Sequence, residues 1–149
     1  MLRWTLAAIH LTALGIGLGA VWARGRALAG TLDGAGLRRV FTADSWWALA
    51  AVLWIGTGLL RAFAGFEKGT AYYVHNHLFW TKMGLLGLVL VLEIRPMILL
   101  IRWRVDLARG TTVDTKVAPA LARVSAVQAL LVLMMVLAAT AMARGFGAF

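Results

Sequence analysis

Four long apolar runs constrain the fold of this chain more than any other feature of its sequence. They lie at about residues 4–21, 45–63, 77–101 and 121–143. A transmembrane helix needs roughly 20 apolar residues, at a rise of about 1.5 Å each, to cross about 30 Å of hydrocarbon. Each run is close to that length or exceeds it. The sequence therefore predicts an all-α fold, an integral membrane four-helix bundle that forms a single transmembrane domain over residues 1–149.

The composition also indicates that lipid, rather than water, is the main solvent of the chain. Hydrophobic residues make up 62% of it and charged residues 14%, against about 45–50% and about 25% in soluble domains. There is no cysteine, which excludes disulfides, thiolate metal sites and cysteine nucleophiles. The net charge is +9, but the basic residues lie in short patches between the apolar runs. We therefore expect the lipid bilayer, and no nucleic acid, as a partner.

The distribution of basic residues predicts how the spans are oriented. Nine lie around the first and third connections: Arg24, Arg26, Arg38, Arg39, Arg102, Arg104, Arg109, Lys116 and Arg123. Four lie toward the other side: Arg3, Arg61, Lys68 and Arg144. The positive-inside rule then places both termini and the loop 66–74 on the periplasmic side of a bacterial inner membrane, with four passes. The competing interpretation is a signal peptide cleaved after "VWA", which would leave three spans and Arg24 outside.

Capping residues mark the expected ends of the helices. Asp44 and Ser45 are candidate N-caps of the second helix. Gly110 suits the C-terminal end of an extended third helix, and Pro119 suits the first turn of the fourth. The segment 32–41, "LDGAGLRRVF", is either a polar loop or a short interfacial helix. As a helix it would turn three apolar side chains toward lipid: Leu37, Val40 and Phe41.

Polar side chains inside the spans are the candidates for function, because a charged group at the centre of a membrane helix costs about 2.5–3.5 kcal/mol on insertion scales. His10 lies in the first run, roughly 9 Å past Trp4. Lys82 lies at a similar depth in the third run, and both helices begin on the same side. The two residues predict a pocket between spans one and three. The alternatives are a neutral His10 bonded to a neighbouring helix and a Lys82 that reaches back to the interface.

Glu93 shares a predicted helix face with His75 and Lys82, because the sequence steps between them correspond to nearly whole turns. We expect this stripe to face the bundle interior, since lipid offers no polar partner. The alternative is a structural role, in which Glu93 pairs with Arg95 or with basic residues of the loops. Separately, the glycines of the first three spans predict close helix packing: the G-x-x-x-G pair Gly15 and Gly19 with Gly17 between them, then Gly56 and Gly58, and Gly84 and Gly87.

Three stretches carry a family resemblance: "GLRRVFTADSWWALAAVLW", "EKGTAYYVHNHLFWTKMGL" and "LEIRPM". Through them, nearly the whole chain resembles the bacterial predicted membrane proteins grouped as domain of unknown function 2214. The resemblance implies a membrane protein of a family without an established activity.

A more distant resemblance rests on a first-span histidine, an arginine at the inner end of that span and a third-span lysine. His10, Arg26 and Lys82 fit these places in the four-helix haem-pathway membrane proteins of the protoporphyrinogen oxidase type, and the layout is also similar to the copper-resistance D group. The resemblance implies that His10 is a haem iron ligand and that Arg26 and Lys82 hold anionic groups or relay protons. Where the haem-pathway family has a second histidine, this chain has Glu93. The resemblance therefore implies His10 alone, with a weak or open second position.

These features together predict a small bacterial inner-membrane protein that binds haem or a related redox cofactor between spans one and three. The candidate cofactor-binding residues are His10, Lys82, Arg26 and Glu93. Two alternatives stay open. One is proton, cation or metal transport along His10, Lys82 and Glu93. The other is a non-catalytic scaffold that forms a homo-oligomer, or packs against larger partners, through its glycines. The sequence does not decide whether the protein is an enzyme.

Overall fold

The computed structural model describes residues 1–64 and 70–147. Its four long helices are α1 (Leu2–Leu28), α2 (Gly34–Phe63), α4 (His77–Ala108) and α5 (Ala118–Ala143). A short helix, α3 (Thr70–Val74), lies between α2 and α4 in the chain. Each long helix is long and apolar enough to cross a membrane. The predicted all-α fold with four spans is therefore confirmed, whereas Lys68 and the first part of the loop 66–74 lie outside the described residues.

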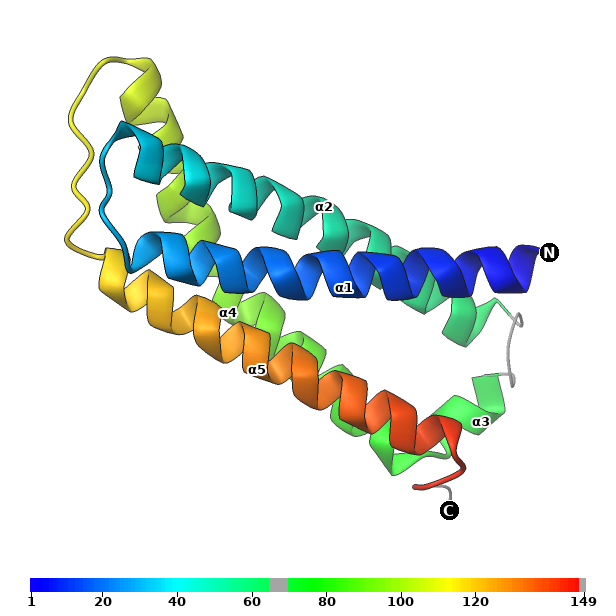
Figure 1. Ribbon diagram of the computed structural model, residues 1–149. Helices are drawn as coiled ribbons and strands as arrows, with labels where there is room; N and C mark the ends of the chain where they lie inside the picture. The colour runs from blue at the N-terminus through cyan, green and yellow to red at the C-terminus, as the bar shows by residue number, and fades with distance from the viewer. Residues whose placement is uncertain (65–69, 148–149) are drawn as a thin grey trace.

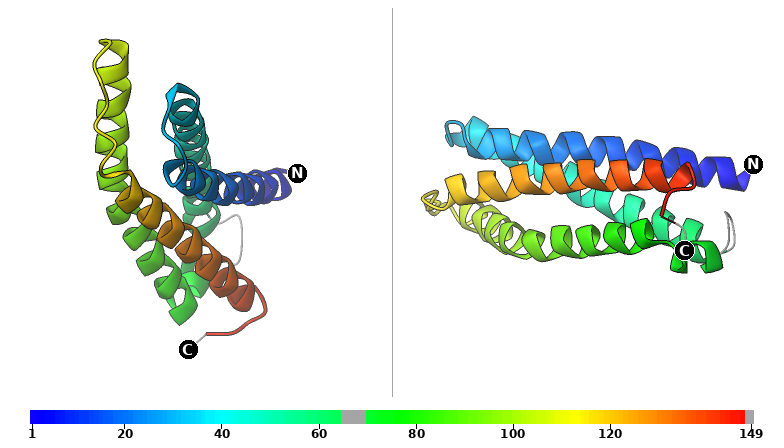
Figure 2. Two further views of the ribbon diagram at one scale, coloured as in Figure 1. Left: turned by 60° about the vertical axis from the view of Figure 1, so that its left-hand side comes forward. Right: turned by 90° about the horizontal axis from the view of Figure 1, so that it is seen from below.

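The long helices form two antiparallel hairpins (Figure 1). α1 packs along α2, α4 packs along α5, and α1 also packs against α5. The contact between α1 and α5 thus joins the hairpins, as the two views of Figure 2 show. Both termini lie at one end of the bundle, which we call the terminus end. The connections 29–33 and 109–117 lie at the opposite end, which we call the loop end.

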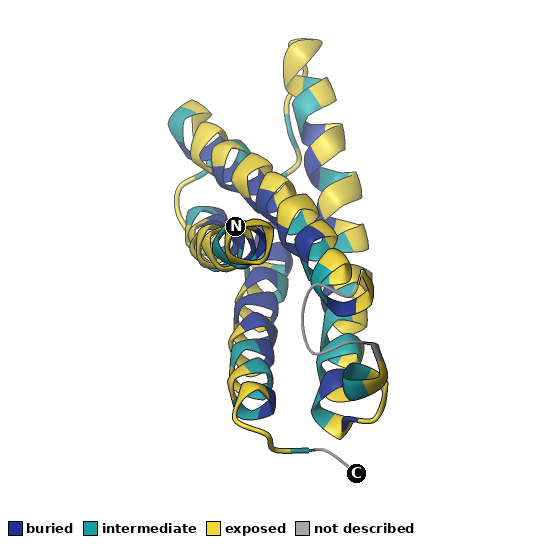
Figure 3. Cartoon of the chain, turned by 90° about the vertical axis from the view of Figure 1, so that its right-hand side faces the viewer, coloured by how far each residue is buried: buried dark blue, intermediate teal, exposed yellow. Residues whose placement is uncertain are grey.

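The buried faces of the helices point toward one another, and their outer faces are exposed for contact with lipid (Figure 3). The middle of the bundle is filled by an apolar cluster that includes Trp47, Trp54, Val132 and Met135. A second cluster, toward the loop end, packs Leu28 against Leu100, Leu121 and other apolar side chains. The third lies at the terminus end and consists of three buried residues: Ala62, Phe79 and Met142.

The start of α2 differs from the predicted one. The carboxylate of Asp33 caps the helix, since its Oδ1 accepts a hydrogen bond of 2.7 Å from the backbone N–H of Gly36. Asp44 and Ser45 lie inside α2, so their prediction as N-caps was wrong. The segment 32–41 is therefore neither a loop nor a separate helix: most of it forms the first turns of α2. These turns bury Leu37 and Val40 in the loop-end core, which corrects their predicted contact with lipid.

Two other predicted boundaries are confirmed. Gly110 follows the end of α4 with a φ of 72°, a left-handed conformation that glycine adopts without steric cost. Pro119 lies in the first turn of α5, where its missing N–H costs no helical hydrogen bond. The first turn of α4 begins at His77, after Asn76 as its N-cap. His75 consequently precedes α4, so it does not share a helix face with Lys82 and Glu93.

Of the glycines predicted to permit close helix packing, Gly17 and Gly58 lie against a neighbouring helix, whereas a Cβ atom at any of the others would meet nothing within 4 Å among the described residues. A Cβ atom at Gly17 would lie 3.3 Å from the Cβ of Ala50 on α2, and one at Gly25 would lie 3.2 Å from the Cβ of Ser125 on α5. Gly15 and Gly19 are exposed, and a Cβ atom at either would meet nothing within 4 Å among the described residues. Within this chain, Gly17 and Gly25 are therefore the positions at which α1 approaches its neighbours.

Candidate functional site

His10 lies near the terminus end of α1 and is buried against α2. Its Nδ1 is 3.0 Å from the backbone carbonyl oxygen of Trp54 and 3.1 Å from the hydroxyl oxygen of Thr57. A carbonyl oxygen only accepts hydrogen bonds, so Nδ1 carries the proton and donates it. The hydroxyl of Thr57 in turn donates to the carbonyl of Leu53. These contacts fix the tautomer of His10 and leave the lone pair on Nε2.

Gly58 makes room for the imidazole ring. A Cβ atom at this position would lie 3.1 Å from Cε1 and 3.6 Å from Nδ1 of His10. Trp54 lies on α2, as Gly58 does, and its ring centroid is 6.3 Å from that of His10. The ring of His10 is thus held by a carbonyl, a hydroxyl and a glycine surface that all belong to α2.

A cavity of ≈350 Å³ lies beside His10 at the terminus end, with most of its wall apolar. All four long helices and α3 contribute to it. Two cationic side chains line it together with His10: Arg61 of α2 and Lys82 of α4. The apolar wall includes Leu14, Trp54, Phe79, Met83, Leu86 and Met135. The cavity therefore combines an oriented imidazole, two cations and an apolar surface.

At the terminus end, the cavity is lined by α3 and the end of α5. Tyr72 lines the cavity and donates its hydroxyl proton to the carbonyl of Met142 over 2.9 Å. The side-chain amide of Asn76, which is buried, donates to the carbonyl of Phe146 over 3.1 Å. Tyr73 packs against Phe79 in a tilted arrangement, with ring centroids 5.6 Å apart. These contacts attach the C-terminal end of α5 to the segment that precedes α4.

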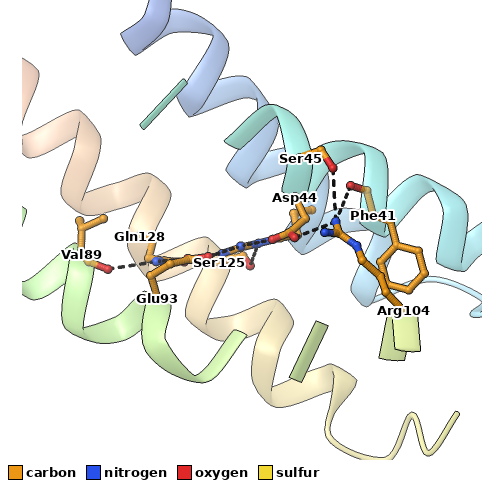
Figure 4. Close-up of polar contacts among 9 residues, drawn as sticks. Phe41, Asp44, Ser45, Val89, Glu93, Arg104, Ser125 and Gln128 are labelled. Carbon is orange, nitrogen blue, oxygen red and sulfur yellow. Dashed lines mark hydrogen bonds and ion pairs between the residues drawn. The ribbon is translucent and has the colours of Figure 1, made fainter. Parts of the chain in front are cut away.

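A second polar centre surrounds Arg24 of α1, whose side chain is 0% exposed. Its Nη1 donates to Asp44 over 2.8 Å and to Glu93 over 2.7 Å. Its Nη2 donates to Glu93 and to the side-chain oxygen of Gln128, each over 2.8 Å. Its Nε donates to the hydroxyl of Ser125 over 3.1 Å. All five N–H groups of the guanidinium are thereby used, with partners on α2, α4 and α5 (Figure 4).

Further contacts complete this centre, which we call the Arg24 network. Arg104 of α4 donates from Nη2 to Asp44 over 2.9 Å and to the carbonyl of Phe41 over 3.0 Å. Gln128 donates to Glu93 and to the carbonyl of Val89. Two cations thus face two carboxylates. Such complete pairing is what a buried charge cluster needs, because an uncompensated charge pays a desolvation cost of several kcal/mol.

The His10 cavity and the Arg24 network are separate sites. Arg24 follows His10 by fourteen residues in α1, which corresponds to roughly 21 Å along the helix. The interval is filled by apolar side chains of the central cluster, among them Val21, Trp47 and Met135. The two sites therefore have no polar connection through the core formed by the described residues.

The structure brings together only two of the four residues predicted for the site. His10 and Lys82 line the same cavity, which lies among all the long helices rather than between spans one and three alone. Glu93 belongs to the Arg24 network. Arg26 is exposed on α1 toward the loop end, where it lines a groove with Arg38 and Arg39. Neither Glu93 nor Arg26 is part of the cavity wall among the described residues.

Sequence reasoning missed Arg24, Gln128 and Arg61 as site residues. Arg24 was assigned to the first connection, but it lies inside the bundle and bonds to Glu93 and Asp44. One signal was available: Ser125 and Gln128 are polar residues three positions apart in an apolar run, so they share a helix face. If this face points into the bundle, Ser125 and Gln128 need a polar partner there, and Arg24 is that partner. Glu93 therefore has a structural partner, as one of its two interpretations required.

Comparison with known proteins adds one finding. A family model described as "Predicted membrane protein (DUF2214)" matches residues 2–147. No curated protein and no solved structure matches the chain. The comparison thus identifies a membrane protein family and assigns no activity to the sites described above.

Proposed function

The chain belongs to the DUF2214 family of predicted membrane proteins, and we propose that its function within the membrane is to bind haem, or a related anionic macrocyclic redox cofactor, in the His10 cavity. The observation that carries the proposal is the hydrogen bond from Nδ1 of His10 to the carbonyl of Trp54, beside a cavity lined by two cations. Metal-ligating histidines characteristically donate their second ring nitrogen to a carbonyl or carboxylate, which fixes the orientation of the ring. His10 has this arrangement.

The chemistry of the wall suits a ligand with an apolar body and anionic edges. The volume of ≈350 Å³ falls at the small end of the range of ligand pockets, about 300–1,000 Å³. Lys82 lies in the wall as a cation for a carboxylate, and the apolar side chains of the wall would contact the body of the ligand. Haem has this combination of a flat apolar ring and two propionates. When bound, it would supply one-electron redox chemistry, with Nε2 of His10 as a ligand of its iron.

The same structure gives less support to the two rival functions. No group of three or more histidine, cysteine, aspartate or glutamate side chains that could hold a metal ion exists among the described residues. A bare metal ion would need such a group of side chains. The iron of a porphyrin needs only one side-chain ligand, because the porphyrin supplies four nitrogen ligands of its own. Proton or cation transport along His10, Lys82 and Glu93 would have to cross the apolar core between the cavity and the Arg24 network. In a scaffold role, the bond of His10 to the carbonyl of Trp54 would serve to join α1 to α2, but this role gives no function to Lys82 in the cavity wall.

The proposed cellular setting follows from the asymmetry of the basic residues. Arg24 is buried and no longer counts as a loop charge, yet the loop end still holds most of the basic residues outside the bundle core. The positive-inside rule places that end in the cytoplasm. The terminus end and the His10 cavity then face the periplasm of a bacterial inner membrane.

Titration of the detergent-purified protein with haem and with its dimethyl ester tests the proposal. The ester keeps the ring and the iron but lacks the two carboxylates. We expect the wild-type protein to bind haem with one equivalent per chain, and to bind the ester about tenfold more weakly because an ion pair to Lys82 is lost, about 1.4 kcal/mol. In Lys82→Met this preference for haem should shrink, while affinity for the ester stays close to that of the wild type. A wild-type protein that binds neither ligand, or a preference unchanged in Lys82→Met, would contradict the proposal.

A further inference from the structure

A long groove between α1 and α2 at the loop end is not used by the proposed function. Its volume is ≈1070 Å³, and three arginines line it: Arg26 of α1 and Arg38 and Arg39 of α2. All three side chains are exposed. The groove lies on the outside of the first hairpin, away from the cavity wall that contains His10 and Lys82. It is therefore a separate candidate for a ligand from the membrane.

Within the part of the chain that the structure describes, no carboxylate forms an ion pair with the arginines of the groove. Among the described residues (1–64 and 70–147), the arginines that form ion pairs with carboxylates are Arg24 and Arg104. Arg26, Arg38 and Arg39 form none there, and the described lining of the groove contains no acidic residue. An anion is thus the complementary ligand. Arginine is well suited to a phosphate group, because its planar fork donates two parallel hydrogen bonds to the oxygens.

The shape of the groove indicates what else the ligand carries. Beyond the arginines, its surface consists largely of small residues, including Gly19, Ala23 and Ala43, and it reaches Ile16 and Trp46. Gly19 precedes Arg26 by seven residues, which is roughly 10 Å along α1 toward the middle of the membrane. We call the part of the groove lined by small residues the trough. A ligand that extends from the arginines into the trough has an anionic head and an apolar tail.

We propose that this groove binds one anionic glycerophospholipid, with its phosphate at the three arginines and an acyl chain along the trough of small residues. Gly19 and Ala23 are exposed on α1, a helix long and apolar enough to span the membrane, so the lipid would enter the groove from the bilayer. Basic pockets between helices near a membrane surface are a recognised mode of binding anionic headgroups. Free inorganic phosphate would use the arginines but leave the apolar trough empty.

Native mass spectrometry of the full chain, released from detergent, measures the lipid that stays bound. We expect retention of phosphatidylglycerol over phosphatidylcholine, and no competition by soluble glycerol 3-phosphate at equal concentration. In the double variant Arg38→Gln/Arg39→Gln, affinity for phosphatidylglycerol should fall by roughly 30-fold. The matched control is Arg102→Gln/Arg109→Gln, which removes two exposed arginines from the same end of the bundle but from the other hairpin. It should retain the lipid.

A second variant tests the tail independently of charge. Gly19→Leu adds an apolar side chain to the trough, at a position where a Cβ atom meets nothing within 4 Å among the described residues. The fold should tolerate the change, yet lipid retention should fall. Equal retention of phosphatidylcholine, equal loss in the Arg102/Arg109 control, or full displacement by glycerol 3-phosphate would overturn the proposal. Each of these readouts is independent of haem binding at His10.

Discussion

Replacing Arg24 by leucine is expected to lower the free energy of unfolding by about 3–5 kcal/mol, the range found when one partner is removed from a buried charge cluster. The loss arises because the cation that now bonds to both Asp44 and Glu93 would be gone. Asp44 would keep its ion pair with Arg104, but Glu93 would keep only the amide of Gln128 among these partners. Gln128 and Ser125 would also lose a donor. Unfolding of the purified protein in mixed micelles, followed by circular dichroism, measures the change.

Two further variants distinguish the loss of the Arg24 network from the general effect of removing an arginine on the free energy of unfolding. Arg26→Leu changes a residue two positions away that is exposed, so its unfolding free energy should change little. Arg24→Leu combined with Glu93→Gln leaves one cation, Arg104, paired with one carboxylate, Asp44. This double variant should regain part of the loss. If Arg24→Leu is no more destabilising than Arg26→Leu, the network does not hold the hairpins together.

Replacing His10 by alanine is expected to weaken haem binding by more than about 100-fold, since loss of a supporting contact to a ligand already costs about 10–100-fold in metal affinity. The variant removes Nε2, the ring nitrogen that carries the lone pair. It leaves Lys82, Arg61 and the apolar wall in place. Absorption titration with haem, at equal protein concentration, gives the two affinities.

The matched control is His75→Ala, which removes a histidine at the same end of the molecule. His75 is exposed and does not line the cavity in the described part of the chain. Its replacement should leave the affinity unchanged. Adding imidazole to His10→Ala should restore an iron–imidazole spectrum, because the cavity then accepts a free ligand in place of the side chain. Equal affinity of wild type and His10→Ala would show that His10 is not the ligand.

The sequence was sufficient to predict the spans because hydrocarbon thickness sets a minimum length for each apolar run. It was not sufficient to predict where the helices end. The chain remains helical beyond the apolar core, so α2 begins at its Asp33 cap and α4 continues to Ala108. Helices can extend into the interface without apolar residues, and composition alone does not reveal that extension. The cap at Asp33 is a local signal that could have located the start of α2.

The depth of His10 and Lys82 was readable from the sequence, because depth follows from position along a helix. The rotation of each helix was not readable. Arg24 and Arg26 are two residues apart and therefore face nearly opposite directions, and nothing in an apolar run states which of them points inward. The contacts of His10 with the carbonyl of Trp54 and with Gly58 depend equally on how α1 and α2 are rotated. These contacts required the structure.

The absorption spectrum of the detergent-purified protein, recorded as isolated and after addition of one equivalent of haem, tests cofactor binding at His10 most directly. A haem held by one histidine gives an intense Soret band that differs from that of haem in detergent alone. We expect this band in the wild type and in His75→Ala, and its loss in His10→Ala. A wild-type protein that shows no such band, as isolated or after haem is added, would contradict the assignment of the cavity.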